Sequence, residues 1–236
     1  MKIHDVKQNS DAWLDLRLGI PTASEFDRIV TPGGKLSKSE TANRYMCVKL
    51  AEWALGAPLP SKETDFMRLG TEREPMARGA YSFETGNEVE EVGFVTTDDG
   101  MIGASPDGLL VTANRGLEIK CPAIQTHIRY MLAGSTIEDE YKVQVQGQIW
   151  VCEFEGVDSI SYCPPLPNVI SQIAPDAKFI GLLSTAVREF VDRLLEARQV
   201  LQTRYGVQPG NLFRDDANAE ENAKAFDAFI NETTVL

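Results

Sequence analysis

Two short apolar segments decide the fold of this chain: ASPDGLLV at residues 104–111 and GLEIKCP at residues 116–122. Within them, residues 107–111 and 116–120 are typical of β-strands, because short apolar runs are bounded by turn-forming residues. The polar residues 112–115 (TANR) lie between the two runs and predict a hairpin turn. The two strands are therefore expected to pair side by side.

The predicted hairpin brings three charged side chains together. Side chains alternate between the two faces of a strand, so Glu118 and Lys120 point the same way. Asp107 begins the preceding strand and can meet them across the pair, and Pro106 fixes the backbone just before it. Two carboxylates and an ammonium in one small patch are costly to bury unless something uses them.

These residue types match a site for a hard divalent cation. Mg²⁺ binds through one or two protein carboxylates and takes its other ligands from water and substrate phosphates. A lysine beside such an ion activates the attacking water or stabilises the charge that develops on the phosphate. The pattern therefore predicts metal-assisted phosphodiester hydrolysis. The alternative is a turn aspartate and a solvated Glu/Lys pair, which is the usual origin of an isolated Glu-x-Lys tripeptide.

Composition limits the class of protein. With 236 residues and 43% hydrophobic content, the chain can bury the core of a single domain. It has no apolar run of about 18 residues and no signal segment, so we expect a soluble, intracellular protein. The cysteines are widely spaced without a CxxC unit, which predicts reduced, mostly buried thiols rather than a zinc site or disulfides. With two histidines, His4 and His127, any metal is expected to be held by oxygen. The cysteines are Cys47, Cys121, Cys152 and Cys163.

The net charge of −12 is unusual for a protein that acts on nucleic acid. The sum hides an asymmetry, because acidic residues gather in a C-terminal tail at about 211–236. Basic residues gather between Lys2 and Lys49. Positive potential confined to a groove would reconcile the total charge with DNA binding.

The order of elements predicts an α/β protein with a central mixed sheet flanked by helices. A capping box at residues 37–40 predicts the start of a long helix that ends near Leu55. Pro75 predicts a kink or break in the next helix. The expected helices are 10–18, 23–30, 37–55, 64–85, 126–133, 139–154 and 176–204, and the expected strands are 89–97, 101–105, 107–111, 116–120, 157–163 and 168–174.

Helical residues add candidates to the patch. Glu74 or Glu72, in the helix before the sheet, can present a third carboxylate, and physical reasoning alone does not choose between them. Gln144 and Gln148 share one face of a later helix, where amides suit phosphate or sugar contact. Trp13 either stacks on a base at a duplex end or anchors the first helix as a core aromatic, and we expect the second role.

The motifs SPDG and GLEIKCP, with ten residues between Asp107 and Glu118, resemble those of the PD-(D/E)xK nuclease superfamily. More narrowly, the chain is similar to the phage lambda exonuclease family of YqaJ-like viral recombinases and alkaline exonucleases. The resemblance runs from about Asp11 to Trp150 and implies a restriction-endonuclease-like core. It rests on several motifs in the same order, among them LRLG at 16–19, TASE at 22–25, Gly70, Glu74 and VQVQ at 143–146.

The resemblance also implies roles for single residues. Asp107, Glu118, the carbonyl of Ile119 and Glu74 would bind Mg²⁺, expected as two ions for which Mn²⁺ can substitute. The resemblance thus favours Glu74 over Glu72. Lys120 would activate or orient the attacking water, with Gln144 nearby. The remaining implied residues hold the terminal 5′-phosphate: Arg17, assisted by Ser24 and Ser105.

The implied activity is 5′→3′ digestion of duplex DNA into 5′-mononucleotides, leaving a 3′ single strand for recombination by strand annealing. The resemblance further implies a homotrimeric ring, a single-strand annealing protein as partner, and a phage or prophage protein in the bacterial cytoplasm. Without a long apolar run, we expect no membrane partner. We expect a single nuclease domain over residues 1–236, with residues 1–60 binding the DNA end. The alternatives are a structure-specific or restriction-type endonuclease with the same metal site, and a non-catalytic DNA-binding module; a nickel or zinc hydrolase is disfavoured.

Overall fold

The predicted hairpin is present in the structure, a computed structural model that describes residues 1–59, 65–134 and 137–210. Strand β5 (Gly108–Leu110) pairs antiparallel with β6 (Arg115–Lys120), and Gly108 lies opposite Leu117. The other elements, in chain order, are β1 (Lys2–His4), α1 (Asp11–Arg17), the 3₁₀-helix η1 (Ala23–Arg28), α2 (Glu40–Leu55), α3 (Asp65–Thr85), β2 (Val89–Glu90), β3 (Phe94–Thr96), β4 (Gly103–Ala104), α4 (Ile124–Ala133), α5 (Ile137–Val151), β7 (Gly156–Ser161), β8 (Val169–Ile173) and α6 (Ala177–Tyr205).

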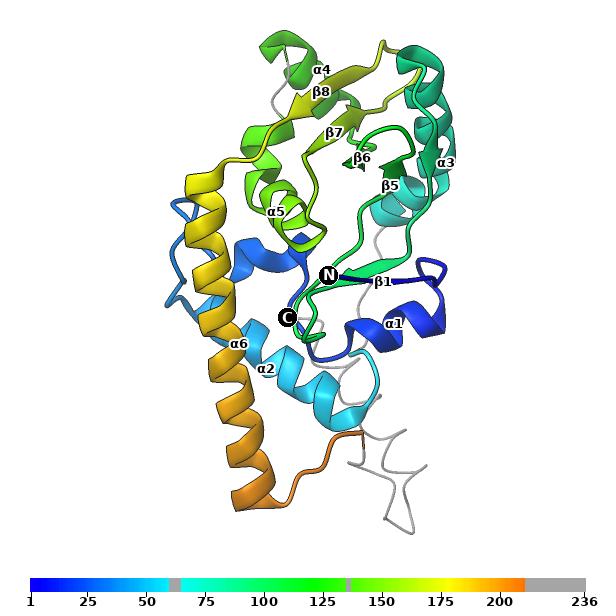
Figure 1. Cartoon of the computed structure of the whole chain (residues 1–236). Coiled ribbons are helices and arrows are strands. Elements are labelled where there is room, and N and C mark those ends of the chain that lie inside the picture. Colours follow the sequence, from blue (N-terminus) through cyan, green and yellow to red (C-terminus); the bar gives the residue numbers. More distant parts are fainter. Residues whose placement is uncertain (60–64, 135–136, 211–236) are drawn as a thin grey trace.

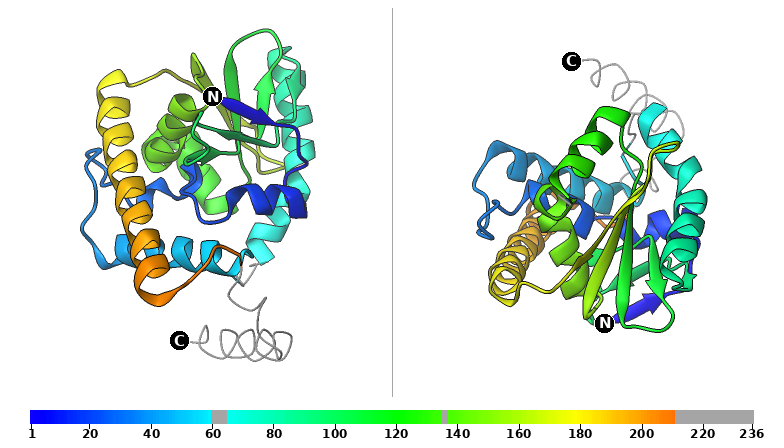
Figure 2. Two further views of the ribbon diagram at one scale, coloured as in Figure 1. Left: turned by 60° about the horizontal axis from the view of Figure 1, so that its bottom comes forward. Right: turned by 90° about the horizontal axis from the view of Figure 1, so that it is seen from above.

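The hairpin belongs to a mixed sheet of five strands in the order β2-β5-β6-β7-β8. Strands β6 and β7 run parallel, and the other neighbours are antiparallel. Helix α3 covers one face, while α5 and α6 lie on the other (Figures 1 and 2). The fold is therefore the expected α/β architecture, with a central mixed sheet flanked by helices.

The prediction of one strand over residues 89–97 is wrong. The chain leaves the large sheet after β2 and enters a second sheet, of order β1-β3-β4, at Phe94. Between the two strands, Gly93 lies so close to Val6 that an added Cβ would fall 1.9 Å from the Val6 carbonyl oxygen. This approach belongs to the pairing of β1 with β3, and β1 was not expected from the sequence. The expected strand 101–105 is shortened to β4.

Helix boundaries differ from the predictions in local ways. Helix α2 begins after Ser39, which accepts a hydrogen bond from the Ala42 amide, whereas the Ser37 hydroxyl bonds to Ser39 instead of capping the helix. Residues 23–28 form a 3₁₀-helix. Helix α3 continues through Pro75 without a break; the expected start at residue 64 and the acidic tail at 211–236 lie outside the described residues.

Two apolar clusters hold the layers together. One joins α2, α5, α6 and the small sheet, with Phe26 and Phe190 fully buried. The other packs Ala77 and Tyr81 of α3 against Leu117 of β6. This packing explains why α3 continues through its proline, since burial of large side chains outweighs the loss of one hydrogen bond.

A buried polar network lies beneath α3 in the second cluster. The Tyr81 hydroxyl donates to the Asp158 carboxylate at 2.6 Å, and Arg115 forms an ion pair with the same carboxylate. Burial, together with this hydrogen bond, raises the pKa of Tyr81 to about 12, so the phenol remains a donor. Helix α3 is thereby tied to β7 by a charge-assisted bond as well as by apolar contact.

We expect Tyr81→Phe to lower the free energy of unfolding by about 1–3 kcal/mol, because Asp158 is buried and loses a donor. Urea unfolding followed by circular dichroism measures this change. The control is Tyr205→Phe, at an exposed position, which should shift stability by less than about 0.5 kcal/mol. Equal stability of wild type and Tyr81→Phe would show that the bond contributes nothing.

Candidate active site

Glu118 lies at the centre of the site, on the face of β6 that α5 covers. It is 2% exposed, and both of its carboxylate oxygens have donors. Oε1 accepts from Gln144 Nε2 at 2.7 Å and pairs with Lys120 Nζ at 2.6 Å. Oε2 accepts from Gln148 Nε2 at 2.6 Å. The expected shared faces of Glu118 with Lys120, and of Gln144 with Gln148, are both confirmed.

Lys120 is held on three sides. Its Nζ donates to Gln144 Oε1 at 3.2 Å and lies 4.2 Å from the centre of the Tyr141 ring, at the point where α5 departs from helical geometry. Burial lowers the pKa of Lys120, but Glu118 and Asp107 outweigh this and raise the pKa above its ordinary value. In this arrangement Lys120 is therefore an ammonium group, suited to orienting a water molecule or stabilising negative charge.

Asp107 meets the hairpin as expected. Its Oδ2 accepts from the Ile119 amide at 2.6 Å, and its own amide donates to the Leu117 carbonyl. Burial raises the pKa of Asp107 well above its usual range, and the nearby Glu118 charge raises it further. Ile119 is buried between Glu118 and Lys120, and metal binding by its carbonyl remains a prediction.

The structure distinguishes the two candidate glutamates of α3. Glu74 lines a cavity of about 510 Å³ together with Asp107, and a second cavity of about 370 Å³ together with Lys120 and Ile119. Burial raises the pKa of Glu74, and the charge of Glu118 also acts to raise it. Glu72 is exposed and lines neither cavity. Glu74 is thus the α3 carboxylate that lies beside the hairpin.

The carboxylates of Asp107 and Glu118 match what a Mg²⁺ site requires of the protein. Within residues 1–59, 65–134 and 137–210, no three His, Cys, Asp or Glu side chains form a ready cage for a metal ion. Asp107 and Glu118 nevertheless lie close enough for one to raise the pKa of the other, which is the repulsion that a cation relieves. Mg²⁺ needs only one or two protein carboxylates, so the residues present match its requirements.

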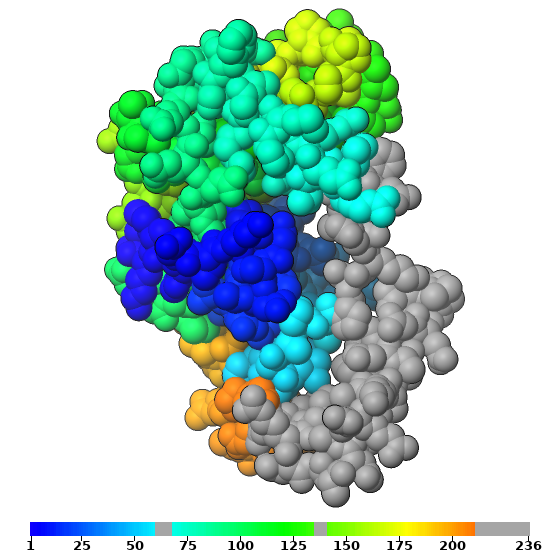
Figure 3. All heavy atoms as spheres, turned by 90° about the vertical axis from the view of Figure 1, so that its right-hand side faces the viewer, coloured from blue at the N-terminus to red at the C-terminus, as the bar shows by residue number. Residues whose placement is uncertain are grey.

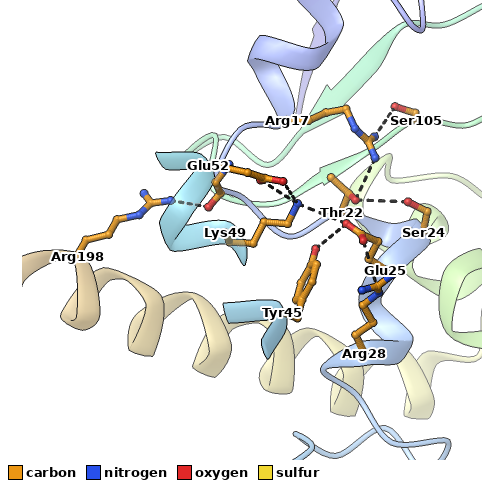
Figure 4. Close-up of polar contacts among 11 residues, drawn as sticks. Arg17, Thr22, Ser24, Glu25, Arg28, Tyr45, Lys49, Glu52, Ser105 and Arg198 are labelled. Atoms are coloured by element: carbon orange, nitrogen blue, oxygen red, sulfur yellow. Dashed lines mark hydrogen bonds and ion pairs between the residues drawn. The ribbon is translucent and has the colours of Figure 1, made fainter. Parts of the chain in front are cut away.

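The residues expected at the 5′-phosphate also come together (Figure 4). Arg17 Nη1 donates to Ser105 Oγ at 3.3 Å, and Nη2 donates to Thr22 Oγ1 at 3.4 Å. Ser24 Oγ lies 3.4 Å from Thr22 Oγ1. The Arg17 guanidinium stacks over the Trp13 ring at 4.1 Å. In the described part of the chain, no carboxylate forms an ion pair with Arg17, so hydroxyl groups and an aromatic face surround a free cation.

A buried ion network stabilises the end of the helix that carries Arg17. Lys49, 6% exposed, pairs with Glu25 at 3.4 Å and with Glu52 at 3.1 Å. Glu52 accepts from the Gly19 amide, while Arg198 donates to the Gly19 carbonyl. Gly19 has a φ of +71°, which favours glycine. The nearby carboxylates are thus occupied by other cations, and Arg17 remains available for an anion.

Sequence reasoning missed several members of the site. Trp13 is not a core aromatic, because it is only partly buried and its Nε1 donates to Ser105 Oγ at 2.9 Å. Thr22 was noted only within the TASE motif, without a role at the phosphate, and Arg78, which donates to the Asp107 carbonyl, was not considered. For Gln148 the sequence did offer a signal, its helical spacing from Gln144. This spacing correctly placed both amides on the same face of α5.

The cysteines and His127 do not offer a competing site. Burial raises the pKa of the Cys121 thiol to about 11, so it is not a thiolate at neutral pH. His127 is buried and bonds to Ser161 and to the Pro167 carbonyl, which is a structural role. All four cysteines are free, as expected, although Cys47 is exposed and Cys121 is only partly buried.

Comparison with known proteins agrees with this geometry. The YqaJ-like viral recombinase domain matches residues 12–155, a range that includes Asp107, Glu118 and Lys120 as well as Arg17 and Ser105. The chain belongs to this family. No curated protein sequence matches it significantly.

Solved structures give the same assignment. An alkaline exonuclease from Laribacter hongkongensis (LHK-Exo) is 30% identical, with a TM-score of 0.74 over 84% of this chain and 98% of that chain. Its complex with dAMP is 31% identical, with a TM-score of 0.75 and the same coverage. A phage-related exonuclease from Haemophilus somnus is 16% identical, covers 75% of this chain and 96% of its own, and supports the fold alone at a TM-score of 0.55. In the described ranges, no helix is long and apolar enough to span a membrane.

We expect Asp107→Asn to change how stability depends on pH. The folded protein binds the Asp107 proton more tightly than the unfolded chain, since burial raises the folded pKa. Without divalent cations, wild-type stability should therefore fall as pH rises from the ordinary Asp value of about 4 towards the raised folded value. Asp107→Asn lacks this contribution and should be more stable than wild type at neutral pH.

Urea unfolding in EDTA, at several pH values between about 4 and 8, measures the difference. The control is Asp192→Asn at an exposed position of α6, which should follow the wild-type curve. Parallel pH profiles for wild type and Asp107→Asn would contradict a raised pKa at this carboxyl group.

Proposed function

We propose that the chain is a Mg²⁺-dependent 5′→3′ exonuclease that digests duplex DNA, releases 5′-mononucleotides and leaves a 3′ single strand for recombination by annealing. Membership of the YqaJ-like viral recombinase family supports an exonuclease of DNA recombination. The similarity to an alkaline exonuclease over 84% of the chain supports the same class of enzyme.

One observation carries the choice of an exonuclease. Arg17, a partly buried cation without a described carboxylate partner, donates to Ser105, and Ser105 is two residues from Asp107. A guanidinium with hydroxyl groups around it suits a terminal phosphate dianion. An endonuclease has no need of such a pocket beside its metal site, so the pocket favours an enzyme that binds a 5′ end.

The site residues divide the chemistry among them. Asp107, Glu118, Glu74 and the Ile119 carbonyl would hold two Mg²⁺ ions, or Mn²⁺ in their place; such ions polarise the phosphate and lower the pKa of bound water. Lys120, as an ammonium, orients the attacking water or stabilises charge on the phosphate. Gln144 bonds to both Lys120 and Glu118 and fixes the position of their side chains relative to each other.

The same proposal includes the organisation of the protein. Residues 1–60 supply most of the end-binding pocket through Arg17 and Ser24, and the whole chain acts as one nuclease domain. Following the family resemblance, we propose a homotrimeric ring, a single-strand annealing protein as partner, and action in the cytoplasm of a phage host. A ring would keep the product strand threaded while combining weakly basic surfaces from each subunit.

The test is digestion of linear duplex DNA with 5′-phosphate or 5′-hydroxyl ends, in Mg²⁺ and in EDTA. We expect wild type to prefer 5′-phosphate ends and to be inactive in EDTA. Lys120→Ala should lower the single-turnover rate by at least about 100-fold, because it removes a cation at the developing charge. Arg17→Ala should abolish the end preference. The exposed Lys178→Ala serves as the control and should match wild type.

Digestion of closed circular duplex DNA distinguishes an exonuclease from the alternatives. Cleavage of circles at the rate of linear DNA would identify an endonuclease with the same metal site. Absence of metal-dependent cleavage on every substrate would instead identify a DNA-binding module.

A further inference from the structure

We propose that Ser105, Pro106 and Asp107 form a fixed spacer of one nucleotide between the 5′-phosphate pocket and the catalytic carboxylates. We assign Arg78 as the positioning residue that fixes this spacer, with Gln8 as its second support. The inference rests on the proposed exonuclease function and gives a structural reason for release of mononucleotides.

The spacer lies between two strands, because β4 ends at Ala104 and β5 begins at Gly108. The Asp107 amide still bonds to the Leu117 carbonyl of β6, whereas the carbonyls of Pro106 and Asp107 accept from side chains. Backbone carbonyls inside a protein must find other donors. Here side chains from distant parts of the chain supply them.

Gln8 and Arg78 bind consecutive carbonyls of the spacer. Gln8 Nε2 donates to the Pro106 carbonyl at 2.8 Å and also lies 2.8 Å from the Val92 carbonyl. Arg78 donates to the Asp107 carbonyl through Nη2 at 3.0 Å and through Nε at 3.3 Å. Arg78 Nη1 pairs with Glu91 Oε1 at 2.6 Å, so the guanidinium is held by partners on both sides. A charged donor makes a stronger bond to a carbonyl than a neutral one.

The two ends of the spacer are fixed independently. At one end, Ser105 Oγ is bonded to Trp13 and Arg17. At the other end, the Asp107 carboxylate is bonded to the Ile119 amide. Proline between them restricts the backbone further. The segment therefore has little freedom to lengthen or shorten.

The supports come from the two walls of one cavity. The cavity of about 510 Å³ is lined by residues 5–9 on one side and by Thr71, Glu74 and Arg78 of α3 on the other. Figure 3 shows the N-terminal segment lying against α3 on this face. The cavity also reaches Asp107. Gln8 and Arg78 thus join the N-terminal segment and α3 to the backbone that carries the catalytic carboxylate.

The reach of the spacer matches one nucleotide. Two residues span at most about 7 Å between their Cα atoms. The sugar and ester linkages between neighbouring phosphates of a DNA strand span a similar distance, whereas two nucleotides span more. A 5′-phosphate held at Ser105 therefore places the next phosphodiester, and not a later one, beside Asp107.

The experiment compares Arg78→Ala and Gln8→Ala with wild type on 5′-phosphate and 5′-hydroxyl duplexes, measuring kcat, KM and product length. Arg204→Ala, at an exposed position of α6, is the matched control and should behave as wild type. For Arg78→Ala we expect kcat to fall about 10- to 100-fold, because small misplacements of reacting groups are costly, while KM for 5′-phosphate ends changes less than about twofold.

The decisive readouts are the effect of the 5′-phosphate on kcat and the length of the released products. In wild type the 5′-phosphate should raise kcat; in Arg78→Ala it should no longer do so, and dinucleotides should appear among the products. The double variant Arg17→Ala/Arg78→Ala should show a loss smaller than the product of the two single losses, because both act through one spacer. Gln8→Ala should lower kcat and the effect of the 5′-phosphate on kcat by a smaller factor than Arg78→Ala.

A different pattern would overturn the spacer. If Arg78→Ala releases mononucleotides only, keeps the phosphate effect on kcat and is additive with Arg17→Ala, Arg78 is merely structural. Thermal unfolding checks that Arg78→Ala folds. If Arg78→Ala does not fold, the same measurements are made on Gln8→Ala. A wild type without end-dependent activity would refute the proposed function itself, which separates the two failures.

Discussion

One buried charge, the Glu118 carboxylate, organises the structure around it. A carboxylate that is 2% exposed costs several kcal/mol unless its oxygens are matched by donors. The ammonium of Lys120, on the same strand, provides part of this match. The amides of Gln144 and Gln148 provide the rest, and they do so only while α5 lies across β6. The placement of α5 therefore depends on the same bonds that orient the candidate catalytic groups.

The parts of the site that follow local periodicity could be predicted from the sequence. Strand alternation placed Glu118 and Lys120 on one face, and the turn between the strands brought Asp107 to them. Helical repeat placed Gln144 and Gln148 together. Each of these relations involves neighbours along one element or across one hairpin, and such relations are decided by backbone geometry alone.

The parts that depend on distant segments could not be predicted in the same way. Nothing in the sequence near Trp13 shows that its indole nitrogen reaches Ser105. The strand expected at 89–97 divides because β1 pairs with β3, and this pairing is invisible to local pattern. Arg78 has no motif, since its partner is a backbone carbonyl that any residue would provide.

The contact of Gln8 with Pro106 joins positions 98 residues apart, and that of Trp13 with Ser105 joins positions 92 apart. Contacts of such large sequence separation carry a larger loop-closure cost than the β5–β6 hairpin, which closes locally. A loss of long-range packing would therefore disrupt the surroundings of Arg17 and Ser105 while leaving the bond between Asp107 and the Ile119 amide within reach of the hairpin alone.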